Sequence, residues 1–507
     1  MSTPAGADPP AKRTVRWYQL DKPVDKLDTD VEHEVTVQRE AIPLLVVPGI
    51  MGSRLRQTAT GEVAWDPPDG VGTTISALFS YLGADAAERK RRMIGPDFNE
   101  GYLTVDSHSP EKLEDLGVTK GEGAQAEARG WGEVHWSSYG GLLQFLETAD
   151  LGPLRKVFAF PVYAIGYNWT ASNGAGGKRV MTRMNEIIAE HNNDKTFCER
   201  VIMITHSMGG LATRSAVLLH GAAPKMLGVL HGVQPATGAP AAYKRMKAGF
   251  EGAAQVVLGR DGKEVTAILA NAPGGLELLP TTDYVNTDGE KAWLTVKARG
   301  GQQLRRLPAS DPYTEIYQER TQFYRLVTPE YVIPEATGAP TQRDGWQRYT
   351  QHLNTAKSFH QSIKLNRHDK TYTYHGVGTK YKAWDRVEWV VSRDRWFSHE
   401  PTTAEVAGAI SGQMPWTGSS NNGEEKLTIA GQDGGFEAKL GDATGEGDGT
   451  VPVPSGDALA TASAVRERIP VDGIDHQMAY DNAGVRAFVT RVVALLAKEW
   501  FETRPRG

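Results

Sequence analysis

Residues 201–215 read VIMITHSMGGLATRS, and the order of residue types in this stretch is the strongest structural signal in the chain. A continuous apolar run leads into Thr205, His206 and Ser207, and small residues with a helical pattern follow at once. A short, β-branched apolar run is typical of a strand buried on both faces. The stretch therefore predicts a strand over 199–205, a tight turn at Ser207 and a helix from about residue 208.

The sequence around this stretch extends the same pattern. Apolar runs predict further strands at 43–48, 157–163, 226–231 and 371–377, and helical spacing of apolar residues predicts helices at 138–148, 177–191 and about 483–500. The part from 157 to 231 thus alternates strand, helix, strand, helix, strand, which indicates parallel strands joined by right-handed crossovers. Residues 386–392, 426–430 and 435–440 instead have the character of antiparallel hairpin strands.

These segments predict the domain organisation. We expect a flexible, polar N-terminal arm over residues 1–40 and one α/β domain over 41–507. Insertions are expected at about 60–135 and 240–365, where the periodicity is weak, and a hairpin insertion at about 380–440; the family resemblance described below implies that the first two are cap or lid regions.

Composition excludes several classes of protein. The chain has 507 residues, is 40% hydrophobic and 23% charged, and carries a net charge of −5, which is ordinary for a globular protein and unlike a nucleic-acid-binding one. The single cysteine, Cys198, cannot form an intramolecular disulfide and is expected to be buried. No secretory signal and no apolar run of about 18 residues is present, so we expect a protein that is cytoplasmic as synthesised, has no transmembrane segment and, if exported, uses a non-Sec route.

The turn at Ser207 follows the logic of a nucleophile elbow, the G-x-S-x-G turn that lifts a serine out of a strand–helix junction. Thr205 stands where the first glycine of that pattern would be, Gly209 fills the second glycine position, and Gly210 follows. A serine that caps the following helix would give the same local sequence, so the stretch alone leaves both roles open.

A serine nucleophile needs a base and an acid that orients the base, and in this type of fold they follow in the order Ser, Asp, His. Asp448 lies in a glycine-rich loop, 446–452, and His476 lies just before the last predicted helix. Asp442 is a rival acid in the same loop, and a Gly/Asp loop is also a possible calcium site, although an EF-hand spacing is missing. The histidines between Ser207 and Asp448 break the required order.

An oxyanion hole is also needed. Its donors are predicted to be the backbone N–H of Met208, directly after the nucleophile, and the N–H of Ile50 in the loop PGIMGS at 48–53, with Met51 as the fallback. A plain glycine turn is the alternative interpretation of that loop.

With these parts in order, the chain resembles the lecithin:cholesterol acyltransferase-like branch of the α/β-hydrolases, which includes lysosomal phospholipase A2-type enzymes. The resembling segments are VVPGIMGSRL (46–55), VYAIGYNW (162–169), THSMGG (205–210), LELLP (276–280), YHGVGTKY (374–381), EGDGTVP (446–452) and DHQMAYDN (475–482). The resemblance implies an α/β-hydrolase fold with a mostly parallel sheet, helices on both faces and inserted cap or lid regions.

The same resemblance implies Ser207, Asp448 and His476 as a triad, Ile50 and Met208 as oxyanion donors, acyl-ester substrates that are commonly phospholipids, and no cofactor or metal. It also makes Trp169 a possible substrate-groove residue, with a purely structural core residue as the alternative. The absence of paired cysteines departs from the animal members of the family.

The predicted function is a serine lipase or phospholipase that acts on lipid esters at a membrane or micelle surface. A lipid O-acyltransferase using the same acyl-enzyme and a non-catalytic partner-binding scaffold are the alternatives. A further hypothesis is an exported antibacterial lipase. The oligomeric state stays open.

Overall fold

The computed structural model describes residues 11–17, 33–66, 85–107, 112–251, 259–335, 339–393, 416–417, 422–429, 432–462 and 465–504. At its centre lies a six-stranded sheet in which every neighbouring pair of strands is parallel. In spatial order its strands are β19 (Glu467–Asp472), β14 (Thr371–Val377), β11 (Met226–Gly232), β10 (Val201–His206), β3 (Leu44–Val47) and β8 (Val162–Ala164). The predicted α/β fold with a mostly parallel sheet is confirmed.

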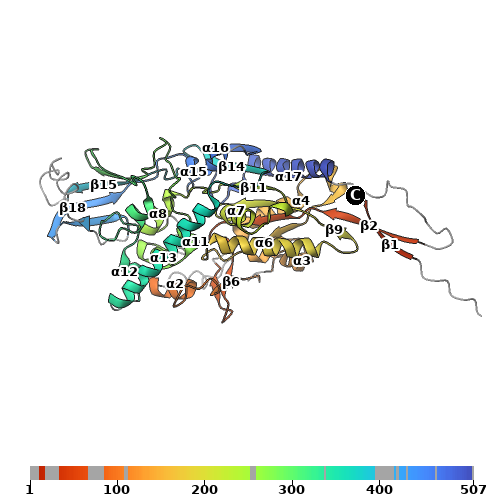
Figure 1. The fold of residues 1–507 in the computed structure, drawn as a ribbon, viewed down its shortest axis with the longest axis horizontal. Helices are drawn as coiled ribbons and strands as arrows, with labels where there is room; N and C mark the ends of the chain where they lie inside the picture. Colours follow the sequence, from red (N-terminus) through yellow and green to blue (C-terminus); the bar gives the residue numbers. More distant parts are fainter. Residues whose placement is uncertain are drawn as a thin grey trace, which may run out of the picture.

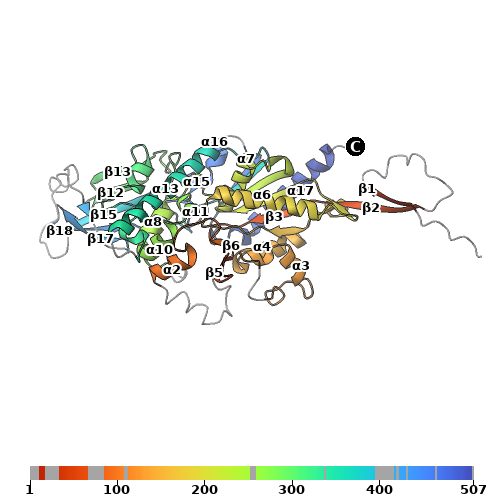
Figure 2. The ribbon, with the colours of Figure 1, turned by 60° about the horizontal axis from the view of Figure 1, so that its bottom comes forward.

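Helices cover both faces of this sheet, as Figures 1 and 2 show. Helices α6 (Asn173–Glu190) and α7 (Gly209–Leu219) share one core with Leu45, Val47 and Met203. Helices α4 (Trp136–Thr148) and α17 (Ala483–Thr503) share a second core with the alternate side chains of the same strands. Burial on both faces is the physical reason why these strands are continuous apolar runs in the sequence.

A second sheet lies at one end of the molecule, around the labels β15 and β18 in Figure 1. Its order is β13 (Gln303–Leu307), β12 (Leu294–Ala298), β15 (Val387–Arg393), β18 (Gln432–Leu440), β17 (Glu424–Ile429) and β16 (Trp416–Thr417). The pairs β15–β18 and β17–β18 are antiparallel, as the sequence predicts for these segments, whereas β12 and β15 are parallel. Strands β12 and β13 are additions that the sequence pattern did not indicate.

Two strands extend from the opposite end. Strand β1 (Ala11–Arg16) pairs in parallel with β2 (His33–Ala41), and the short strands β7 (Phe158–Ala159) and β9 (Thr196–Phe197) join β2 where it enters the body. Of the described residues among the N-terminal forty, 11–16 and 33–40 are therefore strand.

The remaining elements are helices, single turns and a small sheet. The helices are α2 (Ala86–Met93), α3 (Gly123–Ala128), α5 (Leu154–Val157), α8 (Pro240–Ala248), α10 (Gly262–Leu269), α11 (Pro273–Leu276), α12 (Pro329–Val332), α13 (Ala339–Ile363), α15 (Val453–Gly456) and α16 (Ala458–Ala462). Single turns occur at η2 (Trp131–Glu133), η3 (Ala223–Lys225), η4 (Tyr313–Tyr317) and η5 (Ala479–Asp481), and a small sheet consists of β5 (Val63–Trp65), β4 (Leu55–Gln57) and β6 (Leu103–Val105).

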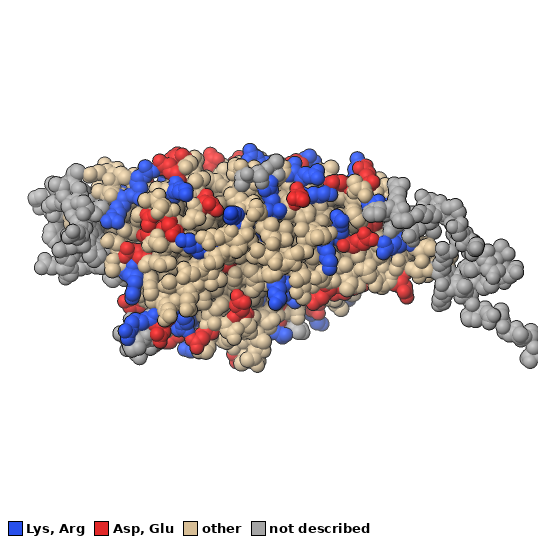
Figure 3. Space-filling model, viewed as in Figure 1, with Lys and Arg blue, Asp and Glu red and all other residues tan. Residues whose placement is uncertain are grey.

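The surface carries charges of both signs. On the face drawn in Figure 3, lysine and arginine side chains alternate with aspartate and glutamate and form no broad basic area. Within the described residues, no helix combines the length and the apolar composition needed to cross a membrane. Cys198 is buried, as expected.

Candidate active site

Ser207 sits in a strained turn between β10 and α7. Its φ angle is 51°, a left-handed value that is uncommon for a residue with a side chain. A Cβ atom at Gly209 would lie 2.5 Å from the Val47 carbonyl oxygen and 2.4 Å from that of Pro48, so the turn can approach β3 only with glycine there. Thr205 is tolerated because its buried hydroxyl lies 2.8 Å from Nδ1 of His231.

The structure brings Ser207, His476 and Asp448 together. Nε2 of His476 lies 2.9 Å from the Ser207 Oγ, and its Nδ1 lies 2.8 Å from Oδ2 of Asp448. The helix-cap alternative does not occur, because Met208 occupies the N-cap position of α7 and no side chain caps that helix. With its Nδ1–H donated to the carboxylate, His476 presents an Nε2 lone pair that can accept the Ser207 hydroxyl proton.

The loop around Asp448 holds the carboxylate in place. Oδ1 accepts hydrogen bonds from the backbone N–H groups of Thr450 at 3.0 Å and Val451 at 2.7 Å, and Asp448 is 1% exposed. Since three donors surround the carboxylate, its charge is compensated although it is buried. The rival acid, Asp442, is exposed and lines a different surface hollow.

Three of the four segments of the site leave the carboxyl ends of strands in the central sheet, and the fourth, the loop with Asp448, follows β18 of the second sheet. Ser207 follows β10, the loop with Ile50 follows β3, and His476 follows β19. Asp448 approaches the end of β14, where a Cβ atom at Gly376 would lie 2.7 Å from the Asp448 Cβ. This edge is where parallel α/β sheets place their reactive groups.

The two predicted oxyanion donors come from the loop after β3, which holds Ile50, and from Met208, the residue directly after Ser207. The Gly49 N–H is already donated to the Tyr139 hydroxyl at 2.9 Å, so the next N–H in the loop, that of Ile50, is the first one open to a ligand. Ile50 and Met51 both line the cavity in front of Ser207. Met208 could contribute only its backbone, because its side chain is buried in the core beside α7.

A cavity of about 590 Å³ opens in front of Ser207 and His476. Its wall is largely apolar, and the larger apolar side chains in it are Ile50, Met51, Phe250, Leu269, Leu278 and Trp384. Besides Asp448, its charged side chains are Arg245 and Glu251, which pair at 3.1 Å, Asp475, and the exposed Lys382. The site can therefore hold an apolar acyl chain next to the Ser207 hydroxyl.

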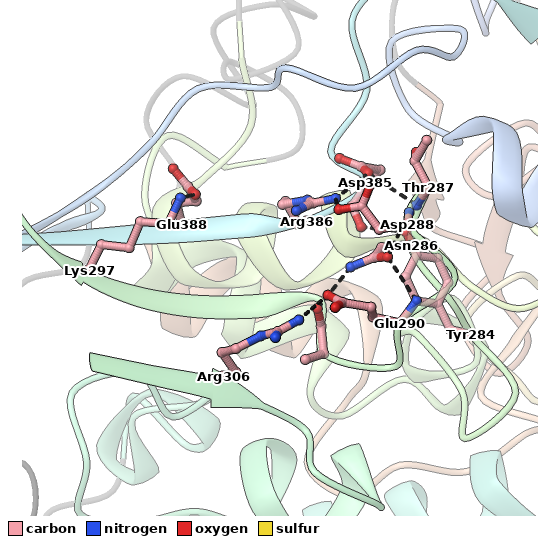
Figure 4. A network of polar contacts seen from close by, with 11 residues as sticks. Tyr284, Asn286, Thr287, Asp288, Glu290, Lys297, Arg306, Asp385, Arg386 and Glu388 are labelled. Atoms are coloured by element: carbon pink, nitrogen blue, oxygen red, sulfur yellow. Dashed lines mark hydrogen bonds and ion pairs between the residues drawn. The ribbon is translucent and has the colours of Figure 1, made fainter. Parts of the chain in front are cut away.

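One wall of the cavity is anchored by the polar network in Figure 4. The hydroxyl of Tyr284 donates to the Asp385 carbonyl at 2.6 Å, and Arg386 pairs with Asp288 at 2.6 Å. Two further ion pairs, Arg306 with Glu290 and Lys297 with Glu388, tie the adjacent strands together. The network fixes the chain directly after the segment that contributes Lys382 and Trp384 to the cavity.

Trp169 lies elsewhere. Its side chain is fully buried and packs edge-on against Trp65, with ring centroids 5.3 Å apart, and it is not among the residues that line the cavity. This position matches the core alternative and gives no support to a groove role.

Two further residues of the site were not predicted. Tyr139 and His206 form a buried pair directly behind the nucleophile, with Tyr139 Oη 2.9 Å from His206 Nδ1. Burial, followed by the neighbouring His476, lowers the pKa of His206 to about 3, so this imidazole is neutral at physiological pH. The only sequence signal for His206 is its position next to Ser207. The expected order of the triad, in which the histidine comes after the aspartate, favours His476 instead.

Metal ligands do not cluster in the part of the chain that the structure describes: no three His, Cys, Asp or Glu side chains there are arranged to hold an ion. The calcium interpretation of the loop at 441–450 consequently finds no ligand set among these residues.

Comparison with known proteins supports the fold. A chain in the crystal structure of the Tle4–Tli4 complex is 27% identical, with a TM-score of 0.73 over 91% of this chain and 99% of that chain. The phospholipase PlaB from Legionella pneumophila aligns over 64% of this chain and 79% of its own at 11% identity, with a TM-score of 0.17, too low to carry an argument.

Sequence comparison adds little. No protein-family model matches the chain. A stretch of 42 residues is 43% identical to the transcriptional regulator MraZ of Thioalkalivibrio sulfidiphilus (strain HL-EbGR7), but it covers 8% of this chain and 28% of that protein. The lecithin:cholesterol acyltransferase-like branch stays a prediction, while the α/β-hydrolase type of fold stands on the structure.

Proposed function

We propose that the protein is a serine ester hydrolase of the lipase or phospholipase type, with Ser207 as nucleophile, His476 as general base and acid, and Asp448 as the group that orients His476. One observation carries the proposal: the hydrogen-bonded series Ser207–His476–Asp448 ends in an apolar cavity at the carboxyl edge of the sheet. A serine hydroxyl without such a base is a poor nucleophile.

In the acylation step, Ser207 Oγ attacks the ester carbonyl carbon while its proton moves to Nε2 of His476. The negative charge that develops on the carbonyl oxygen is stabilised by the N–H groups of Ile50 and Met208, each worth roughly 10²–10³ in rate by analogy with other oxyanion donors. The imidazolium then gives its proton to the alkoxy oxygen, the C–O bond breaks, and an alcohol leaves.

In the deacylation step, water gives a proton to His476 and attacks the acyl-enzyme carbonyl. Return of the proton to Ser207 Oγ breaks the second C–O bond and releases a carboxylic acid. An alcohol in place of water would give a new ester, which is the acyltransferase alternative.

The lining of the cavity supports lipid esters as the substrate class. Ile50, Phe250 and Leu278 surround the space next to Ser207, where burial of each CH₂ group of an acyl chain contributes about 0.8 kcal/mol. Asp475 at the same cavity already accepts the backbone N–H groups of Gln477 and Met478, and the exposed amine of Lys382 would favour an anionic head group, so phospholipids are the preferred subclass in this proposal.

The relation to Tle4 extends the proposal to a protein partner. Tle4 was solved in complex with Tli4. We include in the proposal that this chain likewise binds a protein partner, and that it acts after export by a non-Sec route. Directing the chain to a bacterial periplasm should then slow growth, and Ser207→Ala should restore it; undisturbed growth with the active chain would contradict the export part.

The deciding experiment is a product assay with acyl-labelled phospholipid in the presence of an alcohol acceptor. The proposal expects labelled fatty acid as the main product and none above background with Ser207→Ala. Acylated acceptor as the main product would replace hydrolase by acyltransferase. Equal background with both proteins across phospholipids, acylglycerols and short esters would favour the non-catalytic scaffold.

A further inference from the structure

A series of three hydrogen bonds lies behind the proposed triad and joins two loops that are far apart in the sequence. The Gly49 N–H donates to Tyr139 Oη at 2.9 Å, Tyr139 Oη lies 2.9 Å from His206 Nδ1, and His206 Nε2 lies 2.8 Å from the main-chain carbonyl oxygen of His476. Both side chains are almost fully buried, at 1% exposure for Tyr139 and 2% for His206. The series connects the loop of the proposed oxyanion donor to the backbone of the proposed base.

The direction of each bond follows from its partners. A carbonyl oxygen can only accept, so the His206 proton resides on Nε2 and is donated to His476. His206 is neutral, which leaves a lone pair on Nδ1, and the Tyr139 hydroxyl must therefore donate to it. The same hydroxyl oxygen accepts from Gly49. Every donor in the series has one acceptor, and the arrangement has a single consistent orientation.

At one end, the series fixes the orientation of the Ile50 N–H. The Gly49 N–H is held by Tyr139, and the Gly49 carbonyl accepts from the Gly52 N–H at 3.1 Å. In a trans peptide the N–H points opposite to the carbonyl, so the plane that carries the Gly49 carbonyl also sets the direction of the Ile50 N–H. Rotation of this loop would break both bonds.

At the other end, the series completes the support of His476. The His476 N–H donates to the Asp448 carbonyl at 2.8 Å, and the His476 carbonyl accepts from His206. The peptide groups on both sides of the His476 Cα are thus held, independently of the contacts made by its imidazole.

The packing around the series leaves little room for rearrangement. A Cβ atom at Gly49 would lie 2.9 Å from the Ser207 Cβ and 3.0 Å from His206 Nδ1, and one at Gly52 would lie 2.8 Å from Tyr139 Oη. The His206 ring stands 5.2 Å from that of His476 and 5.6 Å from that of Tyr139, measured between centroids.

We infer that Tyr139 and His206 are positioning residues that hold the loop with Ile50 and the backbone of His476 in a fixed position relative to each other. This inference rests on the proposed function. Neither residue is assigned a proton-transfer step: His206 stays neutral, and its ring nitrogens are both engaged. Their contribution is to keep the Ile50 N–H and the His476 imidazole aimed at one point, where misplacement by about 1 Å costs on the order of 100-fold in rate.

The test compares Tyr139→Phe, His206→Asn and His206→Gln with the wild type on one ester substrate. Tyr139→Phe keeps the ring but removes the shared hydroxyl. His206→Asn is too short to reach the His476 carbonyl, whereas His206→Gln can place an N–H near the position of Nε2. The inference expects kcat to fall by roughly 10- to 100-fold for Tyr139→Phe and His206→Asn, with KM changed by less than about 3-fold and partial rescue in His206→Gln.

Tyr480→Phe is the matched control. The Tyr480 hydroxyl is also buried and its ring also lies near His206, but it donates to the Thr205 carbonyl at 2.8 Å and stands outside the series. A purely structural role predicts equal losses in melting temperature and kcat for Tyr480→Phe and Tyr139→Phe. The inference instead expects kcat to stay within about 3-fold of wild type in Tyr480→Phe.

A double substitution and Ser207→Ala complete the design. Tyr139→Phe combined with His206→Asn should cost about as much in kcat as the worse single change, because the residues act as one unit. Wild-type levels of kcat in both single variants, or a loss in Tyr480→Phe that matches theirs, would overturn the inference. The proposed function would still stand in that case, provided that turnover depends on Ser207. Turnover that survives Ser207→Ala would instead reject the proposed function, and the inference with it.

Discussion

His476 is bound to Asp448 twice. Its Nδ1 lies 2.8 Å from the Asp448 Oδ2, and its backbone N–H donates to the Asp448 carbonyl oxygen, also at 2.8 Å. The side-chain bond selects the tautomer of the imidazole, and the backbone bond fixes the position of the His476 main chain from which the ring extends. The two contacts can be separated by mutation, since only the first depends on the carboxylate.

Asp448→Asn should lower kcat by roughly 10⁴-fold with little change in stability, because an amide in this place stabilises the wrong tautomer of His476. Steady-state kinetics with a soluble ester measures the effect, and Asp442→Asn in the same loop is the control. The assignment of the acid would be wrong if Asp442→Asn caused the larger loss.

Gly209→Ala should both destabilise the protein and reduce activity. The added methyl group would lie 2.4 Å from the Pro48 carbonyl oxygen, and backbone atoms cannot move aside cheaply. Overpacking of this kind costs about 1–3 kcal/mol. Chemical unfolding measures it, with Gly300→Ala as the control, because a Cβ atom at Gly300 meets no atom within 4 Å. Equal unfolding midpoints for both variants would contradict this account of the turn.

Ala242→Trp should distinguish long acyl chains from short ones. Ala242 lies on α8 and lines the cavity in front of Ser207, so an indole there would fill space that an acyl chain needs. We expect kcat/KM to fall at least about 10-fold for a long-chain ester and much less for an acetate. A uniform reduction for both esters would mean that the acyl chain binds elsewhere.

Protein stability should decrease as the pH falls from about 6.5 to 5. Burial is the largest cause that lowers the pKa of seven histidines in the described residues, namely His191, His206, His231, His352, His360, His368 and His375. Below pH 6.5 the unfolded chain binds more protons at these sites than the folded protein does. Each site can therefore remove up to about 1.4 kcal/mol of stability per pH unit until its folded pKa is reached.

Buried carboxylates act in the opposite direction over part of this range. Burial raises the pKa of Glu277 to about 7 and that of Glu40 and Glu133 above its ordinary value, so the folded protein binds protons there that the unfolded chain releases. These three groups are outnumbered by the histidines. Urea unfolding at about pH 7 and pH 5 measures the balance, and a midpoint that is higher at the acidic pH would refute it.

The sequence predicted the parts of the site that depend on local pattern and chain order. Ser207 follows an apolar run, and Asp448 and His476 stand in glycine-rich or pre-helical loops, so each could be located without knowing the contacts between them. Strands such as β10 and β11 could be located because burial on both faces leaves continuous apolar runs.

What the sequence did not indicate depends on tertiary contacts. The Tyr139–His206 bond spans 67 residues, and nothing in the pattern of α4 marks Tyr139 as facing the nucleophile. Strand β19 was missed because it lies at the edge of the sheet, alternates between exposed and half-buried residues, and contains Pro470, which is tolerated only at an edge. The position of Trp169 in the core likewise follows from packing against Trp65, which the local sequence does not encode.

Reaction with a fluorophosphonate probe, followed by mass mapping of the adduct, tests the central claim that Ser207 is the nucleophile activated by His476. The account predicts one adduct, on Ser207, that is absent in Ser207→Ala and forms at least about 100-fold more slowly in His476→Ala. An adduct at another residue, or labelling of Ser207 at an undiminished rate in His476→Ala, would contradict it.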